Sequence, residues 1–324
     1  MEGMVPMKVL ITGANGFVGA NLTRVLVSKG FEVVTLIRPG KEPWRLLDLG
    51  ERIRVAYGDI TDVNGIRKVL SEHRPDGIIN TAIYGGYHYQ KDEDNIYRTN
   101  LYGTRILLDE SIKFGFKWFI NTGSSSEYGE KGVPMSESDY AEPIDSYGIS
   151  KLASSLYCKA KAKQFSLPIF TLRLFSIYGY LEEPHRLIPY LMTSKIKEKT
   201  AQLNSPDSVR DFTFIEDVSE AYLKTIENSQ KLPSGEILNI GTGESTRISE
   251  VVQSFSEVLE QELPVAWSRQ QGRISDNFSK WAADISKAKN LLSWEPKNNL
   301  KSGLAKTYKW FVKNWTEMER WYSE

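Results

Sequence analysis

The sequence predicts an α/β fold in which a doubly wound parallel sheet is joined to a smaller second domain. The first half of the 324-residue chain alternates short β-branched runs with longer amphipathic stretches. This alternation is typical of βαβ units, with helices on both faces of a parallel sheet. A glycine-rich segment follows the first expected strand, and beyond about residue 175 prolines divide the chain into shorter elements.

Each element is expected from its hydrophobic period and from the turn residues that flank it. The expected strands are Lys8–Thr12, Glu32–Ile37, Ile53–Tyr57, Gly77–Thr81, Trp118–Thr122 and Ile169–Phe175. The helices expected between them are Phe17–Lys29, Asp62–His73, Ile96–Phe114 and Ser146–Ser166. Later helices are expected at Ile188–Glu198, Asp217–Glu227, Ser249–Leu259 and Leu300–Trp315.

The two domains are expected to interleave, because no Gly/Ser-rich or charged linker divides the chain. We assign residues 1–175 to a dinucleotide-binding domain, to which residues 205–235 return. Residues 176–204 and 236–324 are assigned to a substrate-binding domain.

Composition excludes several classes of function. The chain has 41 basic and 41 acidic residues, so no net field attracts nucleic acid or anionic lipid. The longest uncharged stretch, Gly77–Gln90, is too short and too polar to span a membrane. Cys158 is the single cysteine, which favours a reducing, cytoplasmic location. The three histidines lie far apart without zinc-site spacing, so we expect no metal.

A dinucleotide-binding turn is predicted directly after the first strand, where residues 12–19 read TGANGFVG. Glycines allow a sharp turn and close approach to a pyrophosphate, and the following helix offers free N–H groups to that anion. An ordinary glycine turn before a helix is the alternative. The expected cofactor-binding residues are Gly13, Asn15, Gly16, Phe17, Val18, Gly19, Arg38, Asp59, Ile60, Thr81, Ala82, Tyr147 and Lys151.

The end of the second strand favours NADP over NAD. An NAD site usually has a carboxylate there for the ribose 2′-hydroxyl, whereas this strand ends at Ile37-Arg38. Arg38 is suited to a 2′-phosphate, with Lys41 or Arg45 in reach. Its alternative role is that of a solvated surface arginine. Asp59 is expected to bind the adenine amino group or, almost as readily, to cap a turn.

A proton-transfer pair is predicted on the helix that starts near residue 146. Tyr147 and Lys151 are four residues apart and therefore share one helix face. A neighbouring ammonium lowers a tyrosine pKa and makes the phenol usable as an acid or base. Ser124 follows the fifth strand, at the sheet edge where α/β active sites form.

These motifs resemble the extended short-chain dehydrogenase/reductase family, which comprises nucleotide-sugar epimerases, dehydratases and reductases with a Rossmann-type fold. The resemblance covers about residues 8–310. Its marks are TGANGFVG at 12–19, GDITD at 58–62, SSSEYG at 124–129, YGISK at 147–151, LRLFSIYG at 172–179, RDFTFIEDV at 210–218, NIGTG at 239–243 and ADISKAKNLLSWEP at 283–296.

The resemblance implies a role for each catalytic residue. Tyr147 is the expected acid/base; if Tyr147→Phe kept near-normal turnover, Glu127 would be the next candidate. Lys151 is expected to hold the nicotinamide ribose, and Ser124 to bind the substrate C4 oxygen. Asn100 is expected to support the lysine. Further substrate contacts are expected at Ser125, Ser126, Tyr84, Ser176 and Arg210, with Arg273 or Arg269 assisting, and Arg210 is assigned to the diphosphate.

The favoured reaction is NADPH-dependent reduction of a nucleotide 4-keto-6-deoxysugar, because the SSSEYG segment looks most like GDP-4-keto-6-deoxymannose reductases. A nucleotide-sugar 4-epimerase is the first alternative. A 4,6-dehydratase comes next, since Ser125 and Ser126 replace its Asp-Glu pair. An NADP-binding regulatory protein is the non-enzyme alternative. The expected partners are a nucleotide-diphosphate sugar and a second copy of the chain, paired through helices 96–114 and 146–166.

Overall fold

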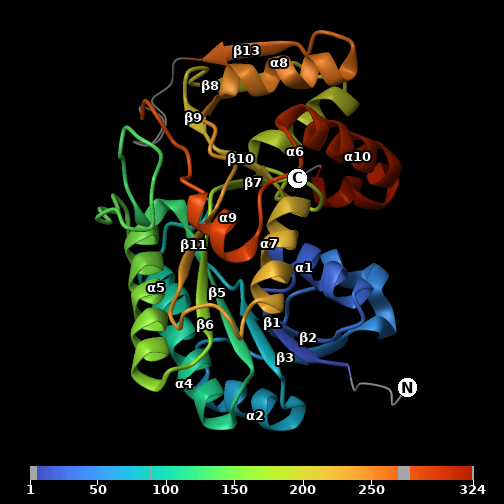
Figure 1. The fold of residues 1–324 in the computed structure, drawn as a ribbon. Helices are drawn as coiled ribbons and strands as arrows, with labels where there is room; N and C mark the ends of the chain where they lie inside the picture. Colours follow the sequence, from blue (N-terminus) through green and yellow to red (C-terminus); the bar gives the residue numbers. More distant parts are fainter. Residues whose placement is uncertain (1–5, 88, 269–277, 323–324) are drawn as a thin grey trace. The chain divides into compact units, whose positions relative to one another are not determined.

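The structure is a computed structural model that describes residues 6–87, 89–268 and 278–322. It divides into two compact units, shown in Figure 1. The first unit holds the described residues up to Gly129, together with Tyr140–Leu174 and Tyr222–Leu238. The second unit holds Glu130–Asp139, Phe175–Ala221 and the described residues from Asn239 onward.

A seven-stranded sheet forms the centre of the first unit, in the order β11-β6-β5-β4-β1-β2-β3. Its strands are β1 Lys8–Thr12, β2 Glu32–Ile37, β3 Arg54–Tyr57, β4 Gly77–Asn80, β5 Trp118–Ser124, β6 Ile169–Leu174 and β11 Ile237–Ile240. The pairings from β3 through β6 are parallel. The predicted doubly wound, Rossmann-type sheet is confirmed. The direction of winding reverses between β1 and β4, which places the binding crevice of such sheets at their carboxyl ends.

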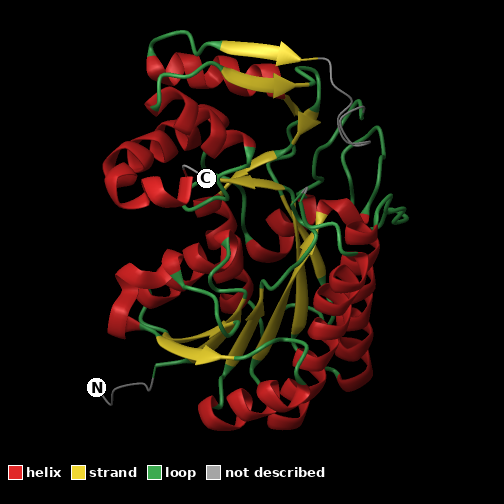
Figure 2. Cartoon of the chain, turned by 180° about the vertical axis from the view of Figure 1, so that it is seen from behind, coloured by secondary structure: helices red, strands yellow, loops and turns green. Residues whose placement is uncertain are grey.

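Helices cover both faces of this sheet (Figures 1 and 2). Helices α2 Val63–His73, α4 Thr104–Phe114 and α5 Ser146–Phe165 pack on one face, and α1 Phe17–Ser28 lies on the other. A core of aliphatic residues fills the space under α2, α4 and α5, and Cys158 is buried within it. Asp62 and Asp145 cap α2 and α5 by accepting hydrogen bonds from backbone N–H groups.

The stretch expected as one helix from Ile96 to Phe114 is interrupted. It consists of α3 Glu93–Tyr97, a π-helical segment η2 Arg98–Gly103, and α4. The π turn is centred on Asn100, whose buried side chain bonds to the loop after β4. Tertiary hydrogen bonding therefore overrides the regular helical pattern of this stretch.

Two short 3₁₀ segments, η1 Trp44–Arg52 and η3 Ser125–Glu127, also belong to the first unit. Short elements build the second unit, and three two-stranded pairs hold it: β7–β10, β9–β12 and β8–β13. These strands are β7 Ser176–Tyr178, β8 Ala201–Asn204, β9 Val209–Arg210, β10 Phe212–Phe214, β12 Thr246–Arg247 and β13 Val265–Ser268. The helices are α6 Leu187–Ile196, α7 Ile215–Glu227, which continues into the first unit, α8 Ile248–Leu259, α9 Ser286–Leu292 and α10 Leu300–Tyr322.

Asp211 connects three sequence motifs inside the second unit. Its buried carboxylate accepts hydrogen bonds from the N–H groups of Thr242 at 2.7 Å, Gly243 at 3.0 Å and Ala283 at 3.0 Å. Burial raises the pKa of this carboxyl, while the hydrogen bonds oppose the rise. The NIGTG and ADIS segments are therefore both tied to one side chain of the RDF segment.

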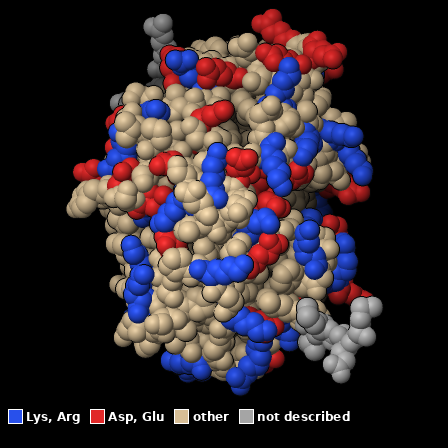
Figure 3. Space-filling view, viewed as in Figure 1, with Lys and Arg blue, Asp and Glu red and all other residues tan. Residues whose placement is uncertain are grey.

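The surface carries acidic and basic side chains intermixed, as Figure 3 shows for one face. Among the described residues, no helix has both the length and the apolar character needed to cross a membrane. The described ranges also contain no group of three or more His, Cys, Asp or Glu side chains that could hold a metal ion.

Candidate active site

The glycine-rich turn brings three pieces of backbone into close contact. Gly13 has a φ of +66°, and a Cβ on it would lie 2.6 Å from the Ala82 nitrogen. A Cβ on Gly19 would lie 2.4 Å from the Gly13 carbonyl oxygen and 2.8 Å from Thr81 Oγ1. Since real Cβ atoms do not approach so closely, only glycine fits at both positions. The end of β1, the start of α1 and the segment after β4 thus meet here.

The first turn of α1 suits an anion. Gly16 is its N-cap, and within the described chain no side chain caps this end and no acidic residue stands in its first turn. The N–H groups of that turn and the positive end of the helix dipole fit a pyrophosphate. Phe17 and Val18, which carry two of these N–H groups, are only partly buried. The residues present therefore fit a dinucleotide.

Asn15 is braced by the segment after β2. Its side-chain amide donates to the Glu42 carbonyl at 2.9 Å, and the Arg45 guanidinium donates to the Asn15 carbonyl at 3.2 Å. Arg45 is buried and lies over the Trp44 ring, so it supports the turn, and its reach to a 2′-phosphate stays a prediction. Arg38 is exposed at the end of β2.

Asp59 has the turn geometry that we considered as its alternative role. Its Oδ1 accepts hydrogen bonds from the Thr61 N–H at 2.8 Å and the Thr61 hydroxyl at 2.7 Å. Ile60 is buried and packs against η2: its Cγ2 is so close to Gly103 that a Cβ there would lie only 2.7 Å away. A contact of Asp59 with adenine stays a prediction.

The YGISK and SSSEYG segments lie against each other in the first unit. A Cβ on Gly148 would lie 2.4 Å from the Ser126 carbonyl oxygen, so the first turn of α5 touches the segment after β5. The Tyr147 ring lies beside the turn after β4, 3.5 Å from where a Cβ on Gly85 would be. Tyr147 and Ser126 are partly buried. This packing places the expected acid/base near the carboxyl end of β5.

Lys151 points from α5 to the end of β5. It is 1% exposed, and its ammonium donates a hydrogen bond to the Thr122 carbonyl. Burial lowers the pKa of Lys151 to about 8, although the negative charge of Glu127 opposes this shift. The Thr122 hydroxyl contacts the Tyr222 hydroxyl at 2.6 Å. Burial thus makes the neutral form of Lys151 more accessible than that of an exposed lysine.

Asn100 connects the loop after β4 to α5. Its side chain accepts from the Tyr84 N–H and donates to the Tyr84 carbonyl, both at 2.8 Å, and donates to the Ser150 hydroxyl at 2.9 Å. The Ser150 hydroxyl in turn donates to the Tyr147 carbonyl at 2.8 Å. Asn100 therefore reaches α5 through Ser150, the neighbour of Lys151.

Ser124 stands at the end of β5 and begins η3. Its hydroxyl accepts a hydrogen bond from the Ser126 N–H at 3.1 Å, and its own N–H donates to Glu127 Oε1 at 2.9 Å. Ser125 is buried. Glu127 is fully buried and forms an ion pair with Arg173 at 2.7 Å. Glu127 as a reserve acid is therefore wrong, because its carboxylate is engaged inside the core.

The second unit holds the remaining described substrate candidates. The Arg210 guanidinium donates to the Val209 carbonyl at 2.7 Å and lies 6.0 Å from the centre of the Trp281 ring. Ser176 is partly buried on β7, and its N–H donates to the Asp211 carbonyl at 2.9 Å. Arg269 and Arg273 lie outside the described residues.

Sequence reasoning missed the Glu127–Arg173 pair and the bracing role of Arg45. Glu127 and Arg173 belong to the SSSEYG and LRLFSIYG motifs, and a charged residue within a strand as apolar as β6 was the available signal.

Curated relatives align with nearly the whole chain. It is 28% identical over 337 residues to a dTDP-glucose 4,6-dehydratase of Xanthomonas campestris pv. campestris, with 95% of this chain and 93% of the relative covered. It is 25% identical over 325 residues to a UDP-glucose 4-epimerase of Lactobacillus helveticus, with 94% and 97% covered.

Solved structures are similar over the same extent. A UDP-glucose 4-epimerase from Thermotoga maritima, with UDP-glucose, has a TM-score of 0.87 and 26% identity, covering 95% of this chain and 100% of that one. A UDP-glucuronic acid 4-epimerase from Bacillus cereus, with UDP-glucuronic acid and NAD, has a TM-score of 0.83 and 27% identity, covering 95% and 99%. Residues 9–241, more than half of the chain, match the family described as NAD dependent epimerase/dehydratase. The chain belongs to the NAD-dependent epimerase/dehydratase family.

Proposed function

We propose that this protein is a nucleotide-sugar 4-epimerase that works with NAD. The observation that carries the proposal is the packing of the Tyr147 turn and buried Lys151 against the β5 end, where Ser124 stands. The glycine turn that fits a dinucleotide belongs to the same unit. Two similar solved structures are 4-epimerases that contain a UDP-sugar, which favours the alternative over the reductase first expected.

The chemistry needs an acid/base, a counter-charge and a hydrogen-bond partner for one oxygen. When bound, NAD would accept a hydride from C4 of the sugar and return it to the opposite face. Tyr147 would take the proton of the C4 hydroxyl and later give it back. The Lys151 ammonium would stabilise the phenolate, and Ser124 would hold the C4 oxygen. Asn100 would keep α5 in register with the loop after β4.

A 4,6-dehydratase is the weaker proposal, even though such an enzyme is among the similar proteins. Removal of water from the sugar requires an acid/base pair in addition to the tyrosine, and Ser125 and Ser126 stand where we expected that pair. A hydroxyl has no ionisable proton in the useful pH range, so it does not replace a carboxylate as general base.

A reductase of a 4-keto-6-deoxysugar, close to GDP-4-keto-6-deoxymannose reductases, is the competing proposal. Its support is the exposed Arg38 at the end of β2, where no acid stands. If Arg38 binds a 2′-phosphate, Arg38→Ala should weaken NADP binding by about 2 kcal/mol and leave NAD binding unchanged. Cofactor titrations of both proteins check this. A wild-type preference for NAD supports the epimerase.

Incubation with candidate sugar nucleotides distinguishes the reactions. UDP-glucose, UDP-glucuronate, dTDP-glucose and a GDP-4-keto-6-deoxysugar are each followed at 340 nm, by mass spectrometry, and by chromatography that separates epimeric sugar nucleotides. An epimerase converts a sugar to an isomer of equal mass without net change in reduced cofactor. A dehydratase product lacks one water, and a reductase consumes reduced cofactor. Tyr147→Phe is the control, with turnover expected to fall about 10²–10⁴-fold. No turnover with any substrate favours a regulatory protein.

The substrate side stays a proposal of the same kind. We assign cofactor binding to the first unit and sugar-nucleotide binding to the second, with Arg210 on the diphosphate and Ser176, Tyr84 and Ser125 near the sugar. A homodimer through α4 and α5 and a cytoplasmic location also stay predictions from the sequence.

A further inference from the structure

A fully buried carboxylate joins three elements beneath the candidate active site. Glu127 Oε1 accepts hydrogen bonds from the Ser124 N–H on β5 and from the Ser155 hydroxyl on α5, both at 2.9 Å. Glu127 Oε2 accepts from Arg173 Nε on β6 at 2.7 Å. With three donors on two oxygens, this side chain is held in one position.

Arg173 makes this arrangement costly to disturb. Its side chain is 4% exposed, and the guanidinium lies 4.5 Å from the centre of the Tyr128 ring. Burial alone would lower the pKa of Arg173, but Glu127 and Tyr128 together outweigh burial and raise it. Removing one partner of such a pair leaves an uncompensated buried charge. The pair is therefore a fixed part of the core around β5 and β6.

The same carboxylate lies beside the helix that carries Lys151. Ser155, which donates to Glu127, is one turn after Lys151 and on the same face of α5. Helix α4, which packs against α5, carries two acidic residues that have partners. Asp109 accepts from the Tyr157 hydroxyl, and Glu110 accepts from the Arg67 guanidinium. Farther along the same packing surface, Glu93 of α3 bonds to Ser146.

The elements packed against α5 carry the other titratable side chains of this region. Strand β5 carries no titratable side chain, η3 supplies Glu127 and β6 supplies Arg173. Segment η2, which packs against α5, carries the exposed Arg98 and Tyr102, and α5 itself carries Tyr147, Tyr157, Cys158, Lys159, Lys161 and Lys163. Glu127 is the first of these to favour the charged form of Lys151, against the larger effect of burial.

We propose that Glu127 is a positioning residue for Ser124 and Lys151: its carboxylate fixes the end of β5 against α5 through Ser124 and Ser155, and it places a negative charge beside the helix turn that carries Lys151. This inference rests on the proposed function in one respect only, namely that Lys151 takes part in the reaction. Glu127 does not meet substrate, and it acts through the two residues that it holds.

A double-mutant cycle on the cofactor-free protein tests the electrostatic part. Glu127→Gln is made in the wild type and in Lys151→Met, and urea unfolding is measured at pH 7 and pH 10. At pH 7 we expect Glu127→Gln to lower the folding equilibrium constant about tenfold more when Lys151 is present. At pH 10 Lys151 is neutral in the folded protein, so this difference disappears. The cost of the unpaired Arg173 is common to both backgrounds and cancels.

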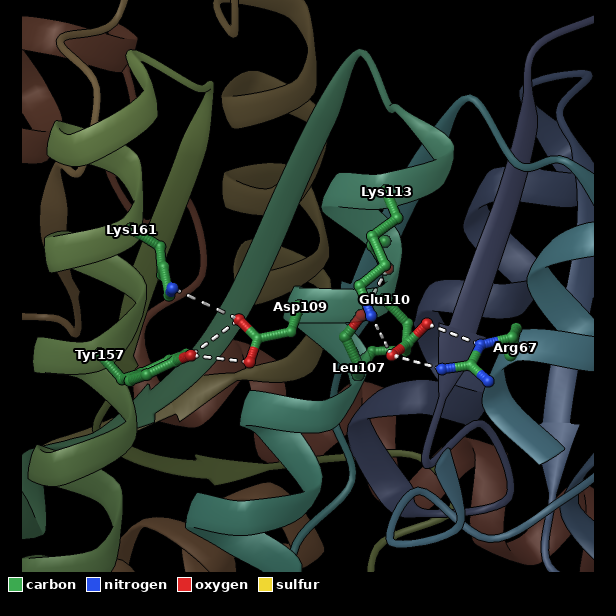
Figure 4. Close-up of polar contacts among 8 residues, drawn as sticks. Arg67, Leu107, Asp109, Glu110, Lys113, Tyr157 and Lys161 are labelled. Atoms are coloured by element: carbon green, nitrogen blue, oxygen red, sulfur yellow. Dashed lines mark hydrogen bonds and ion pairs between the residues drawn. The ribbon is translucent and has the colours of Figure 1, made fainter. Parts of the chain in front are cut away.

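Glu110→Gln is the matched control (Figure 4). Glu110 is also a buried glutamate of the first unit, and it pairs with Arg67 at 3.1 Å and Lys113 at 2.7 Å. Its replacement should cost the same with and without Lys151 at both pH values. If Glu127→Gln behaves like Glu110→Gln, Glu127 has no charge role towards Lys151 and the proposal is overturned.

A second set of variants covers misfolding and turnover. If Glu127→Gln does not fold, the cycle is repeated in Arg173→Met, which removes the unpaired cation. In turnover, Glu127→Gln should move the alkaline limb of the kcat profile about one pH unit lower, whereas Glu127→Asp, which keeps the charge, should leave it in place. An unmoved limb in Glu127→Gln contradicts the proposal. A wild type without turnover contradicts the proposed function alone, because the stability cycle needs no substrate.

Discussion

Replacing Lys151 by methionine should change how folding stability depends on pH. Burial lowers the pKa of this lysine from its ordinary 10.5 to about 8. The folded protein therefore releases the proton near pH 8 and the unfolded chain near pH 10.5. Between these values the unfolded chain binds more protons, so the free energy of unfolding rises with pH.

The size of the effect follows from the shift. At about 1.4 kcal/mol per pKa unit, the difference of about 2.5 units corresponds to roughly 3 kcal/mol. The wild type should gain about that much stability relative to Lys151→Met between pH 8 and pH 10.5, and nothing below pH 7. The lost hydrogen bond to the Thr122 carbonyl and the altered packing shift the whole curve and leave its slope with pH unchanged.

Urea unfolding at half-unit steps from pH 6.5 to pH 10.5, without cofactor, measures this difference. Lys159→Met is the control, because Lys159 is an exposed lysine on the same helix, and its curve should run parallel to that of the wild type. Parallel curves for the wild type and Lys151→Met would show that the buried ammonium costs nothing, and the reasoning from burial would then fail.

Three further perturbations follow from the contacts described. Gly19→Ala places a Cβ 2.4 Å from the Gly13 carbonyl oxygen, so NAD affinity measured by fluorescence titration should fall at least tenfold. Unchanged affinity would show that this turn does not bind the cofactor. Arg210→Ala should raise the KM for the sugar nucleotide with little change in cofactor affinity, and an equal KM would make Arg210 structural. In Asp211→Asn, a side-chain NH₂ group replaces one of the oxygens that accept from backbone N–H groups. The free energy of unfolding, measured in urea, should then fall by at least about 2 kcal/mol. An unchanged unfolding curve would refute this expectation.

Six of the seven strands of the sheet could be predicted, because each is specified by its own residues, whereas β11 Ile237–Ile240 was not expected. The strands Lys8–Thr12 and Glu32–Ile37 begin and end at the predicted residues. Both contain β-branched residues and are followed by residues typical of turns. The strands of the second unit were not predicted. β9 and β12 contain two residues each, and such short pairs exist only because a distant partner lies opposite.

The candidate site could be predicted as a set of residues but not as an arrangement. The spacing of Tyr147 and Lys151 indicates one helix face, yet the contact between Gly148 and the Ser126 carbonyl depends on how α5 packs. Likewise, nothing local distinguishes Glu127 from a solvent-facing acid. Its partner in the core, Arg173, lies 46 residues later in the chain.

The π turn around Asn100 has a consequence for insertions and deletions in this stretch. Such a turn amounts to one extra residue in an otherwise regular helix. Because the π turn absorbs the extra residue, deleting one residue from η2 other than Asn100 would restore regular α-helical winding and leave the residues after it in phase with α3. A deletion within the regular winding at the start of α4 would instead rotate every residue after it by about 100° around the helix axis. Leu107 and Leu108, both fully buried, would then leave the core. Segment η2 is thus the place where homologous chains can differ by one residue in length and keep the phase between α3 and α4.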